Sequence, residues 1–78
     1  MADRVKELDL KGLKCPLPVL RTRKALERLV AGERLIVLCT DPLAGIDIPH
    51  LVHQTGDLIE NRHARDGVFV FHVLRRGR

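Results

Sequence analysis

The 78-residue sequence has few aromatic residues: two Phe, and neither Tyr nor Trp. Few rings are therefore present for stacking on nucleic-acid bases. Its two cysteines are too few for a disulfide framework. No apolar run approaches the ~20 residues that cross a bilayer, and residues 1–4 lack the apolar stretch of a signal peptide. These absences lead us to expect a cytoplasmic protein without a membrane span.

The composition is that of one small folded domain. With 45% hydrophobic and 31% charged residues, the chain resembles globular rather than disordered proteins. A domain of this size buries roughly 60% of the surface of its unfolded chain, so its core is thin. The net charge of +4 favours acidic surfaces as partners, whether protein, RNA or lipid. We interpret the basic run over residues 75–78 as a solvated tail.

The first half of the chain predicts a strand, a helix and a second strand. Residues 4–10 alternate with a period of two and have mixed polarity, which suits an edge strand. Apolar residues at helical spacing follow over residues 16–30, with Gly32 as a stop signal. Residues 34–39 are almost continuously apolar, which suits a central strand.

The second half predicts a loop, a helix and a hairpin. We expect a loop over residues 42–45 and then a helix over residues 47–55, with Asp47 as its N-cap and Pro49 in its first turn. Residues 58–74 form the hairpin, because Asp-Gly between two strand-like runs is a strong turn signal. A two-residue turn at that dipeptide predicts two cross-strand pairs, Arg65 with Val68 and His63 with Val70.

The order of these elements predicts the fold. It is strand, helix, strand, helix, strand, strand, in which the first crossover makes a parallel pair and the hairpin an antiparallel one. Two amphipathic helices can cover one face of a four-stranded mixed sheet, which is a two-layer α/β sandwich. No linker or internal repeat divides the sequence, so residues 1–78 are interpreted as a single domain.

Cys15 lies where the first strand ends and the first helix begins. As the N-cap of that helix it would place Pro16 at N1 and Pro18 at N3, positions that tolerate proline. Only the Leu17 N–H would then remain to reach the sulfur. A helix N-terminus and the adjacent Lys14 lower the pKa of a thiol. The pattern thus favours an exposed, reactive sulfur over a small buried side chain, and it excludes a Cys-x-x-Cys pair.

Two acidic residues are expected near this cysteine. Functional loops gather beyond the C-terminal ends of parallel strands, and the loops after the first two strands should lie side by side. Asp41 and Asp47 would therefore sit near Cys15. They could shape a thiol pocket or hold basic residues of a partner.

Other candidate residues have simpler interpretations. Cys39 ends an apolar strand and is expected in the core, the alternative being a resolving thiol for Cys15. His50 and His53 are three residues apart, but no third ligand is evident, so we expect no metal site. Phe69 and Phe71 share one face of a strand, either as sheet packing or as an exposed apolar patch.

One set of short motifs resembles a known family. The set comprises Gly12-Leu13, Cys15-Pro16-Leu17-Pro18, Lys24-Ala25-Leu26, Gly32-Glu33, Asp41-Pro42, Asp47-Ile48-Pro49 and Asp66-Gly67, with Asp9 ahead of it and a basic end. Together these residues resemble the TusA-like, also called SirA-like, sulfur-carrier family over about residues 8–76. The resemblance implies the same two-layer sandwich, with Cys15 carrying sulfane sulfur as a persulfide.

The resemblance also implies partners and supporting residues. A cysteine desulfurase or rhodanese-like protein would load the sulfur, and an acceptor protein would take it. Gly12, Pro16 and Pro18 match the family's turn and helix-start residues, and Lys24 matches a helix lysine for which we expect a docking role. Members of the tRNA-thiolation relay tend to have an acidic residue between the two prolines, where this chain has Leu17. The pathway therefore stays open among tRNA thiolation, sulfur oxidation and cofactor sulfuration.

Three functions are weighed. The first is a sulfur carrier acting through Cys15, a sulfurtransferase-type shuttle rather than a free-standing enzyme, with no cofactor, no metal and no direct nucleic-acid partner. The second is a basic RNA-binding or regulatory module. The third is a thiol redox protein using Cys15 with Cys39.

Overall fold

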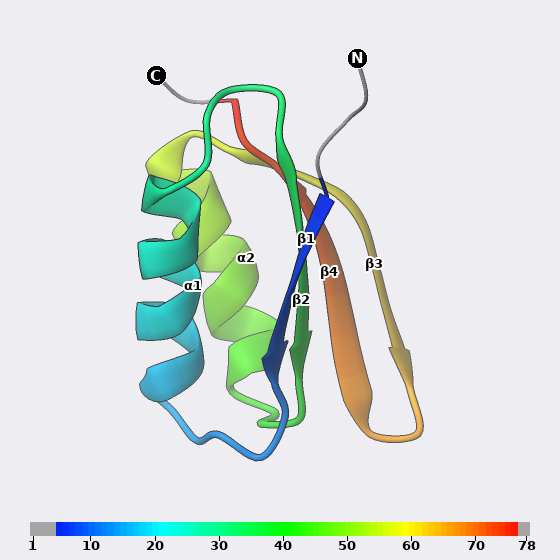
Figure 1. The fold of residues 1–78 in the computed structure, drawn as a ribbon. Coiled ribbons are helices and arrows are strands. Elements are labelled where there is room, and N and C mark those ends of the chain that lie inside the picture. Colours follow the sequence, from blue (N-terminus) through cyan, green and yellow to red (C-terminus); the bar gives the residue numbers. More distant parts are fainter. Residues whose placement is uncertain (1–4, 77–78) are drawn as a thin grey trace.

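A mixed sheet with both helices packed on one of its faces makes up the structure, a computed structural model that describes residues 5–76 (Figure 1). The elements in chain order are β1 (Val5–Leu10), α1 (Leu17–Glu27), β2 (Arg34–Cys39), α2 (Ala44–Thr55), β3 (Leu58–Arg65) and β4 (Val68–Leu74). The predicted βαβαββ order and two-layer α/β sandwich are confirmed. Within the described residues neither helix has the length and apolar character that crossing a membrane requires.

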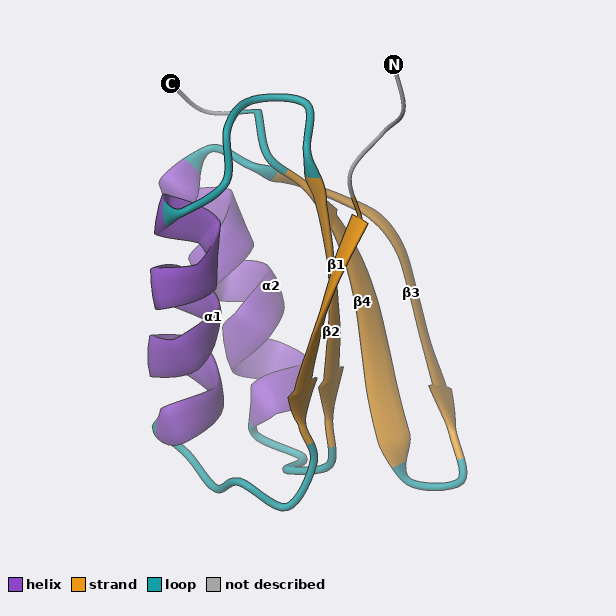
Figure 2. Ribbon diagram, viewed as in Figure 1, coloured by secondary structure: helices purple, strands orange, loops and turns teal. Residues whose placement is uncertain are grey.

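The four strands lie in the order β1-β2-β4-β3 (Figure 2). β1 pairs in parallel with β2, β2 pairs antiparallel with β4, and β4 pairs antiparallel with β3. The predicted edge position of the first strand and the central position of the second are confirmed. Arg4, where we expected β1 to begin, lies outside the described residues, as do Gly77 and Arg78 of the basic run.

The hairpin turn has the predicted geometry. Asp66 and Gly67 have φ values of 52° and 78°, the left-handed region that a two-residue hairpin turn of type I′ requires at both central positions. The structure contains both of the pairs that this turn predicts, Arg65 with Val68 and His63 with Val70.

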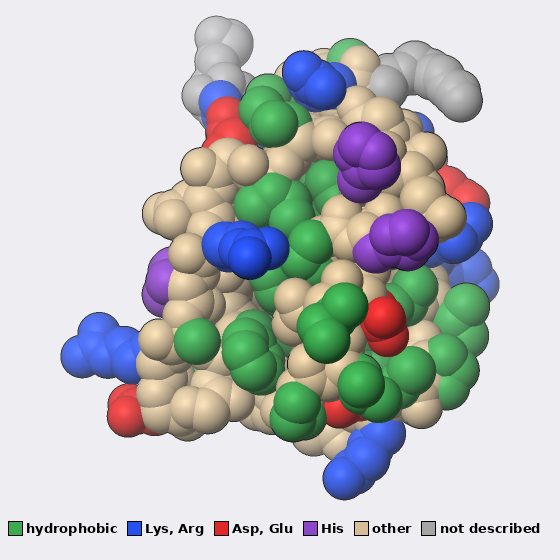
Figure 3. Space-filling model, turned by 180° about the vertical axis from the view of Figure 1, so that it is seen from behind, with side chains coloured by type: hydrophobic (Ala, Val, Ile, Leu, Met, Phe, Trp, Pro, Cys, Tyr) green, Lys and Arg blue, Asp and Glu red, His purple; other side chains and the backbone are tan. Residues whose placement is uncertain are grey.

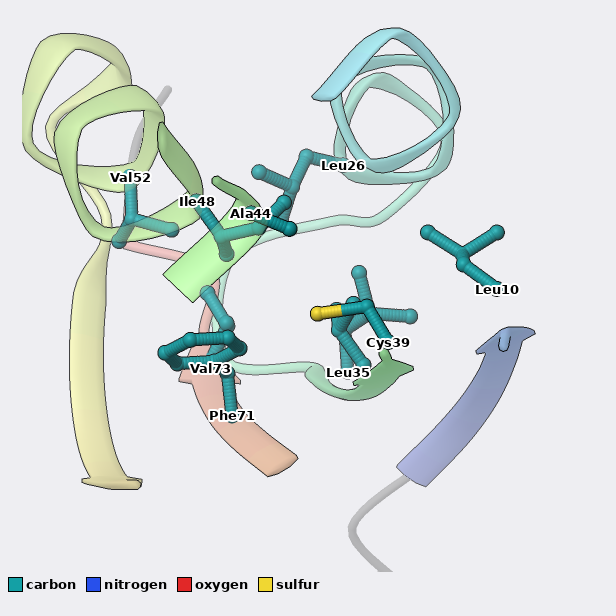
Figure 4. Packing of buried hydrophobic residues seen from close by; sticks show 10 residues of the cluster. Leu10, Leu26, Leu35, Cys39, Ala44, Ile48, Val52, Phe71 and Val73 are labelled. Atoms are coloured by element: carbon teal, nitrogen blue, oxygen red, sulfur yellow. The ribbon is translucent and has the colours of Figure 1, made fainter. Parts of the chain in front are cut away.

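The core lies between the helices and the sheet. Leu35, Val37 and Cys39 are fully buried, and they alternate along β2 with residues that face the uncovered side. The two helices and the neighbouring strands close the cluster around them (Figure 4), with Leu10, Leu26, Ala44, Ile48, Val52, Phe71 and Val73. Phe71 is buried and Phe69 packs partly buried against the same cluster, so these rings pack on the sheet rather than form an exposed patch.

The first helix is shorter than predicted. It begins at Leu17 rather than at residue 16, has Pro16 as its N-cap, and ends at Glu27 rather than near residue 30. The end comes early because the N–H groups of Arg28 and Leu29 donate to carbonyls three residues back, Ala25 and Leu26, which tightens and closes the last turn. Helical spacing of apolar residues continued past the point at which the backbone leaves the helix.

The second helix begins earlier than predicted. Asp47 is not its N-cap: α2 begins at Ala44, so part of the expected loop over residues 42–45 is the first helical turn and Pro49 lies in the second turn. The reason is Asp41, whose Oδ1 accepts the Leu43 N–H at 3.1 Å and whose carbonyl accepts the Ala44 N–H at 2.9 Å. Asp41 therefore starts the turn that we assigned to Asp47.

The far end of α2 is joined to the end of β4 by one buried carboxylate. Gly56 has a φ of 81° and closes the helix. Next to it, Asp57 accepts hydrogen bonds from the Thr55 hydroxyl at 2.6 Å, the Arg75 guanidinium at 2.9 Å and the Arg76 N–H at 2.9 Å. The Asp57 side chain is fully buried and that of Arg75 is 15% exposed, so water can replace few of these contacts.

We expect Asp57→Asn to lower the free energy of unfolding by about 2–4 kcal/mol, because it removes the charge of a buried, hydrogen-bonded pair and leaves Arg75 without its counter-ion. Urea unfolding followed by circular dichroism measures the change. Asp9→Asn is the control: the Asp9–Lys11 pair is 3.9 Å long and exposed, and its loss should change stability by less than about 0.5 kcal/mol. Equal effects of the two substitutions would contradict the role given to Asp57.

Candidate functional site

Two loops meet at the C-terminal ends of β1 and β2. One loop leads from β1 into α1 and the other from β2 into α2, and Figure 1 shows both at the same end of the molecule. The parallel register, which pairs Leu10 with Cys39, makes the two loops begin level with each other. The sequence prediction that the segments around Cys15 and Asp41 lie together is thus borne out by the geometry.

Asp41 ties these loops together. Its Oδ2 accepts the Cys15 N–H at 2.6 Å while its Oδ1 accepts the Leu43 N–H of its own loop. A second hydrogen bond also joins the two loops: the Gly12 N–H donates to the Thr40 hydroxyl at 2.9 Å. Gly12 also has a φ of 86°, a conformation that favours glycine. Asp41 therefore acts on the backbone of Cys15, and Thr40 is a supporting residue that the sequence analysis did not identify.

Cys15 is not the N-cap of α1. It lies in a four-residue turn with a cis peptide bond to Pro16, closed by the Leu17 N–H donating to the Lys14 carbonyl at 2.9 Å. The Leu17 N–H is therefore not available to the sulfur, and Pro16 and Pro18 have no N–H. Pro18 occupies N2 instead of the predicted N3. No N–H of residues 16–18 at the start of α1 is directed to the Cys15 thiol.

The Cys15 thiol is exposed and lies beside a carboxylate from the other helix. Its Sγ is 3.7 Å from Asp47 Oδ2, within hydrogen-bond distance for sulfur. A shallow pocket of about 200 Å³ opens here between the starts of the two helices. Its lining is mostly apolar, with Pro16, Val19 and Leu51 next to Asp47, His50 and Gln54.

The charges around Cys15 raise its pKa, contrary to our expectation. The pKa of the thiol lies above its ordinary value because the pocket excludes part of the solvent around the sulfur, because Asp47 is negative and accepts the thiol hydrogen bond, and because Asp41 is negative. We expected the helix N-terminus and Lys14 to lower it. The turn described above withholds the helix N–H groups. Partial desolvation, followed by the two carboxylates, therefore sets the direction of the shift.

Exposed apolar side chains lie at the same end of the molecule as the pocket. Four large apolar side chains near the starts of the two helices are exposed to solvent: Leu17, Leu20, Leu43 and Ile46. Figure 3 shows hydrophobic side chains gathered over this lower end of the molecule, with acidic side chains among them. Residues of this kind around a reactive group are typical of a surface that contacts other proteins.

The remaining predicted residues lie elsewhere. Cys39 is fully buried, with its sulfur directed into the core cluster (Figure 4). Lys24 does not line the thiol pocket; it lies in a separate groove between α1 and β1. His50 lines the thiol pocket, whereas His53 does not. In the part of the chain that the structure describes, no three His, Cys, Asp or Glu side chains are grouped so as to hold a metal ion.

His50 and Gln54 are pocket residues that the sequence analysis did not assign to the thiol. A signal for both existed, because His50 is three residues and Gln54 seven residues after Asp47, the spacing of one helix face. The helix boundaries, however, were not known well enough to use that spacing.

Comparisons with known proteins agree with the fold. Residues 6–75 match the sequence profile of the family described as Sulfurtransferase TusA. The sulfur carrier protein TusA of Allochromatium vinosum is 41% identical over 75 residues, which cover 96% of this chain and 99% of that protein. A protein of Neisseria meningitidis, provisionally named a sulfur carrier, is 46% identical over 69 residues, which cover 88% of this chain and 93% of that one. The crystal structure of a SirA-like protein from Desulfitobacterium hafniense is similar with a TM-score of 0.80 and 26% identity, covering 91% of this chain and 97% of that chain.

We expect Asp47→Asn to lower the pKa of Cys15 and so to speed its reaction with iodoacetamide several-fold at pH 7.5, since removal of the negative charge favours the thiolate. Alkylation rates measured between pH 6 and 10 give the pKa directly. Glu27→Gln, which alters an exposed carboxylate of α1, should have no effect. An unchanged or slower rate in Asp47→Asn would show that this carboxylate does not control the thiol.

Proposed function

This chain belongs to the TusA family of sulfur carriers, and we propose that it carries one sulfane sulfur atom as a persulfide on Cys15, between a donor protein and an acceptor protein. The observation that carries the proposal is the position of the thiol. Cys15 is exposed on a rigid turn at the edge of a pocket that has room for a second sulfur. Two different proteins can reach such a sulfur in succession, which a shuttle requires.

The loading step begins with the loss of a proton from Cys15. The Asp47 carboxylate, 3.7 Å away, accepts that proton and releases it to water. The resulting thiolate attacks the outer sulfur of the donor's persulfide. A new S–S bond forms on Cys15 as the donor's S–S bond breaks, and the donor cysteine leaves as a thiolate. The sulfur moves without a change in oxidation state, so electrons balance.

The unloading step runs in the opposite sense. A thiolate of the acceptor attacks the outer sulfur on Cys15, the acceptor's S–S bond forms, and the S–S bond on Cys15 breaks. Cys15 leaves as a thiolate and takes up a proton, which Asp47 can deliver from water. A raised pKa makes Cys15 a poor leaving group when no proton is supplied. Asp47 and Asp41, which contribute to the raised pKa, therefore support retention of the sulfur on Cys15 until an acceptor is docked.

The partners follow from this chemistry. The donor presents a persulfide, as a cysteine desulfurase or a rhodanese-like protein does, and the acceptor presents a reactive thiol. Each turnover returns the carrier unchanged but needs both proteins, so the chain acts as a shuttle rather than as a free-standing catalyst. We propose that it does so in the cytoplasm. The same two steps serve tRNA thiolation, sulfur oxidation or cofactor sulfuration. Leu17, exposed between the two prolines, is the apolar contact by which partners of one such pathway would recognise this carrier.

The two other functions receive less support. Phe69 and Phe71, the chain's only aromatic residues, pack on or in the core, so they offer no exposed stacking platform for RNA. Cys39 is fully buried and points into the core, which favours packing over a resolving role.

Cys15→Ser tests the proposal. Incubation with a cysteine desulfurase and cysteine should add one reductant-sensitive sulfur atom to the normal protein and none to the variant, as measured by intact mass. Stability should stay within about 1 kcal/mol, because the residue is exposed. Sulfur acquired by the folded variant would contradict the assignment to Cys15.

Cys39→Ala is the matched cysteine control. Loading of one sulfur should be unchanged, while the free energy of unfolding should fall by about 1 kcal/mol because a buried side chain loses volume. Loss of loading in a folded Cys39→Ala protein would instead favour the redox function.

A further inference from the structure

A second surface feature lies away from the thiol pocket, between α1 and the edge strand β1. Two hollows of about 220 and 480 Å³ adjoin there, and Lys6 and Arg28 line both. The floor of the first hollow is apolar and includes Leu8, Ala25 and Leu35. The second contains two exposed apolar side chains, Val5 and Val30. Together the hollows form one groove along the edge of the sheet, which we call the edge groove.

The edge groove is basic. Arg21 and Lys24 lie on α1 and Arg28 is its C-cap residue; their spacing of three and four residues places them on one face of the helix. Lys6 faces them from β1, since its register partner Leu35 is buried on the helix side of the sheet. In the part of the chain that is described, none of these four exposed cations makes an ion pair or a side-chain hydrogen bond.

Acidic residues do not neutralise this surface. Glu7 lines the first hollow and Glu33 the second, so the four cations exceed the carboxylates of the groove. The charge therefore stays available to a partner of opposite sign, and it raises the encounter rate with that partner.

The backbone beside these cations is also open to a partner. Among the described strands β1 pairs only with β2, so the outer edge of β1 presents N–H and C=O groups that another strand can use. Alternate side chains of a strand added there would point to the helix side, towards Lys6 and the three cations along α1 and its C-cap. Unpaired backbone groups, basic side chains and an apolar floor thus lie together along the outer edge of β1.

We infer that the edge groove binds an extended acidic segment of a partner protein, which adds to the sheet as a strand next to β1 and directs its carboxylates to Lys6, Arg21, Lys24 and Arg28. The inference rests on the proposed function in naming a partner of the carrier as the source of the segment. A polypeptide is favoured over RNA because the sheet edge offers backbone hydrogen bonds that match another strand, and because no aromatic ring lines the groove.

The groove and the thiol serve one docking event. Arg21 lies one helical turn from Leu17, at the end of α1 that carries the thiol pocket. A segment held in the groove would tether its protein next to Cys15 and raise the local concentration of that protein's reactive sulfur. Acidic segments on a donor and on an acceptor would compete for the same groove, so the two partners would dock in turn.

The test uses a nine-residue peptide of alternating glutamate and valine, with blocked ends, added to the ¹⁵N-labelled full chain. We expect amide shift changes confined to β1 and α1, and binding that weakens as salt rises. The double variant Lys24→Glu/Arg28→Glu should weaken binding about tenfold or more. Arg23→Glu is the matched control on the same helix, because Arg23 lines a different hollow beside Gln54 and Thr55; it should change binding less than about threefold.

A second arm separates strand addition from simple charge attraction. The same peptide with alternate backbone amides N-methylated keeps its charge but cannot pair with β1, and it should bind at least about tenfold more weakly. Equal binding of the methylated peptide, equal effects of Arg23→Glu and the double variant, or tighter binding of a single-stranded RNA oligomer to the same residues would overturn the inference. The two proposals fail separately. If only this inference is wrong, the peptide does not bind but Cys15 is still loaded from a small-molecule persulfide. If only the proposed function is wrong, Cys15 is not loaded but the peptide still binds.

Discussion

The site depends on one carboxylate that joins two loops. Asp41 accepts an N–H from Cys15 on one loop and an N–H from Leu43 on its own. These bonds hold the Cys15 turn in place and also begin α2, the helix that carries Asp47. The contact between the thiol and Asp47 is a consequence, since both partners are placed by the same residue. A parallel β1–β2 pair is the precondition, because only that pairing brings the two loops to one end of the sheet.

The electrostatics of the thiol suit a carrier better than a catalyst. An enzyme nucleophile gains from a lowered pKa, which here would also make Cys15 a good leaving group and shorten the life of the proposed persulfide. In this structure the start of α1 does not stabilise the thiolate, because two prolines lack an N–H and the Leu17 N–H donates to the Lys14 carbonyl. Asp47 and Asp41 lie near the sulfur and raise its pKa further. A protonated thiol reacts more slowly with small oxidants than a thiolate does.

The surface has two parts, to which our proposals give separate tasks. Near the thiol lie exposed apolar side chains and the carboxylates of Asp41 and Asp47. Along β1 and α1 the charges are positive and the floor is apolar. A partner that uses both parts gains orientation from the second and chemistry from the first. The arrangement also explains why Lys24, expected to serve the site, lies in a groove of its own instead of beside the sulfur.

Sequence alone determined the order of elements, the paired hairpin, the buried run of β2 and the exposure of Cys15, because each of these depends on local pattern: period-two or helical spacing, the Asp-Gly turn, and prolines around a cysteine. It also indicated that Asp41 and Asp47 would lie near the thiol. Tertiary structure decided what those two residues do. The start of α2 at Ala44 arises from the bonds that Asp41 makes to Leu43 and Ala44. The raised pKa of Cys15 arises in part from Asp41 and Asp47, which lie 26 and 32 positions away, a separation that no local pattern contains. A thiol's acidity is set by the groups that folding brings around it, and here these are carboxylates from the neighbouring loop and helix.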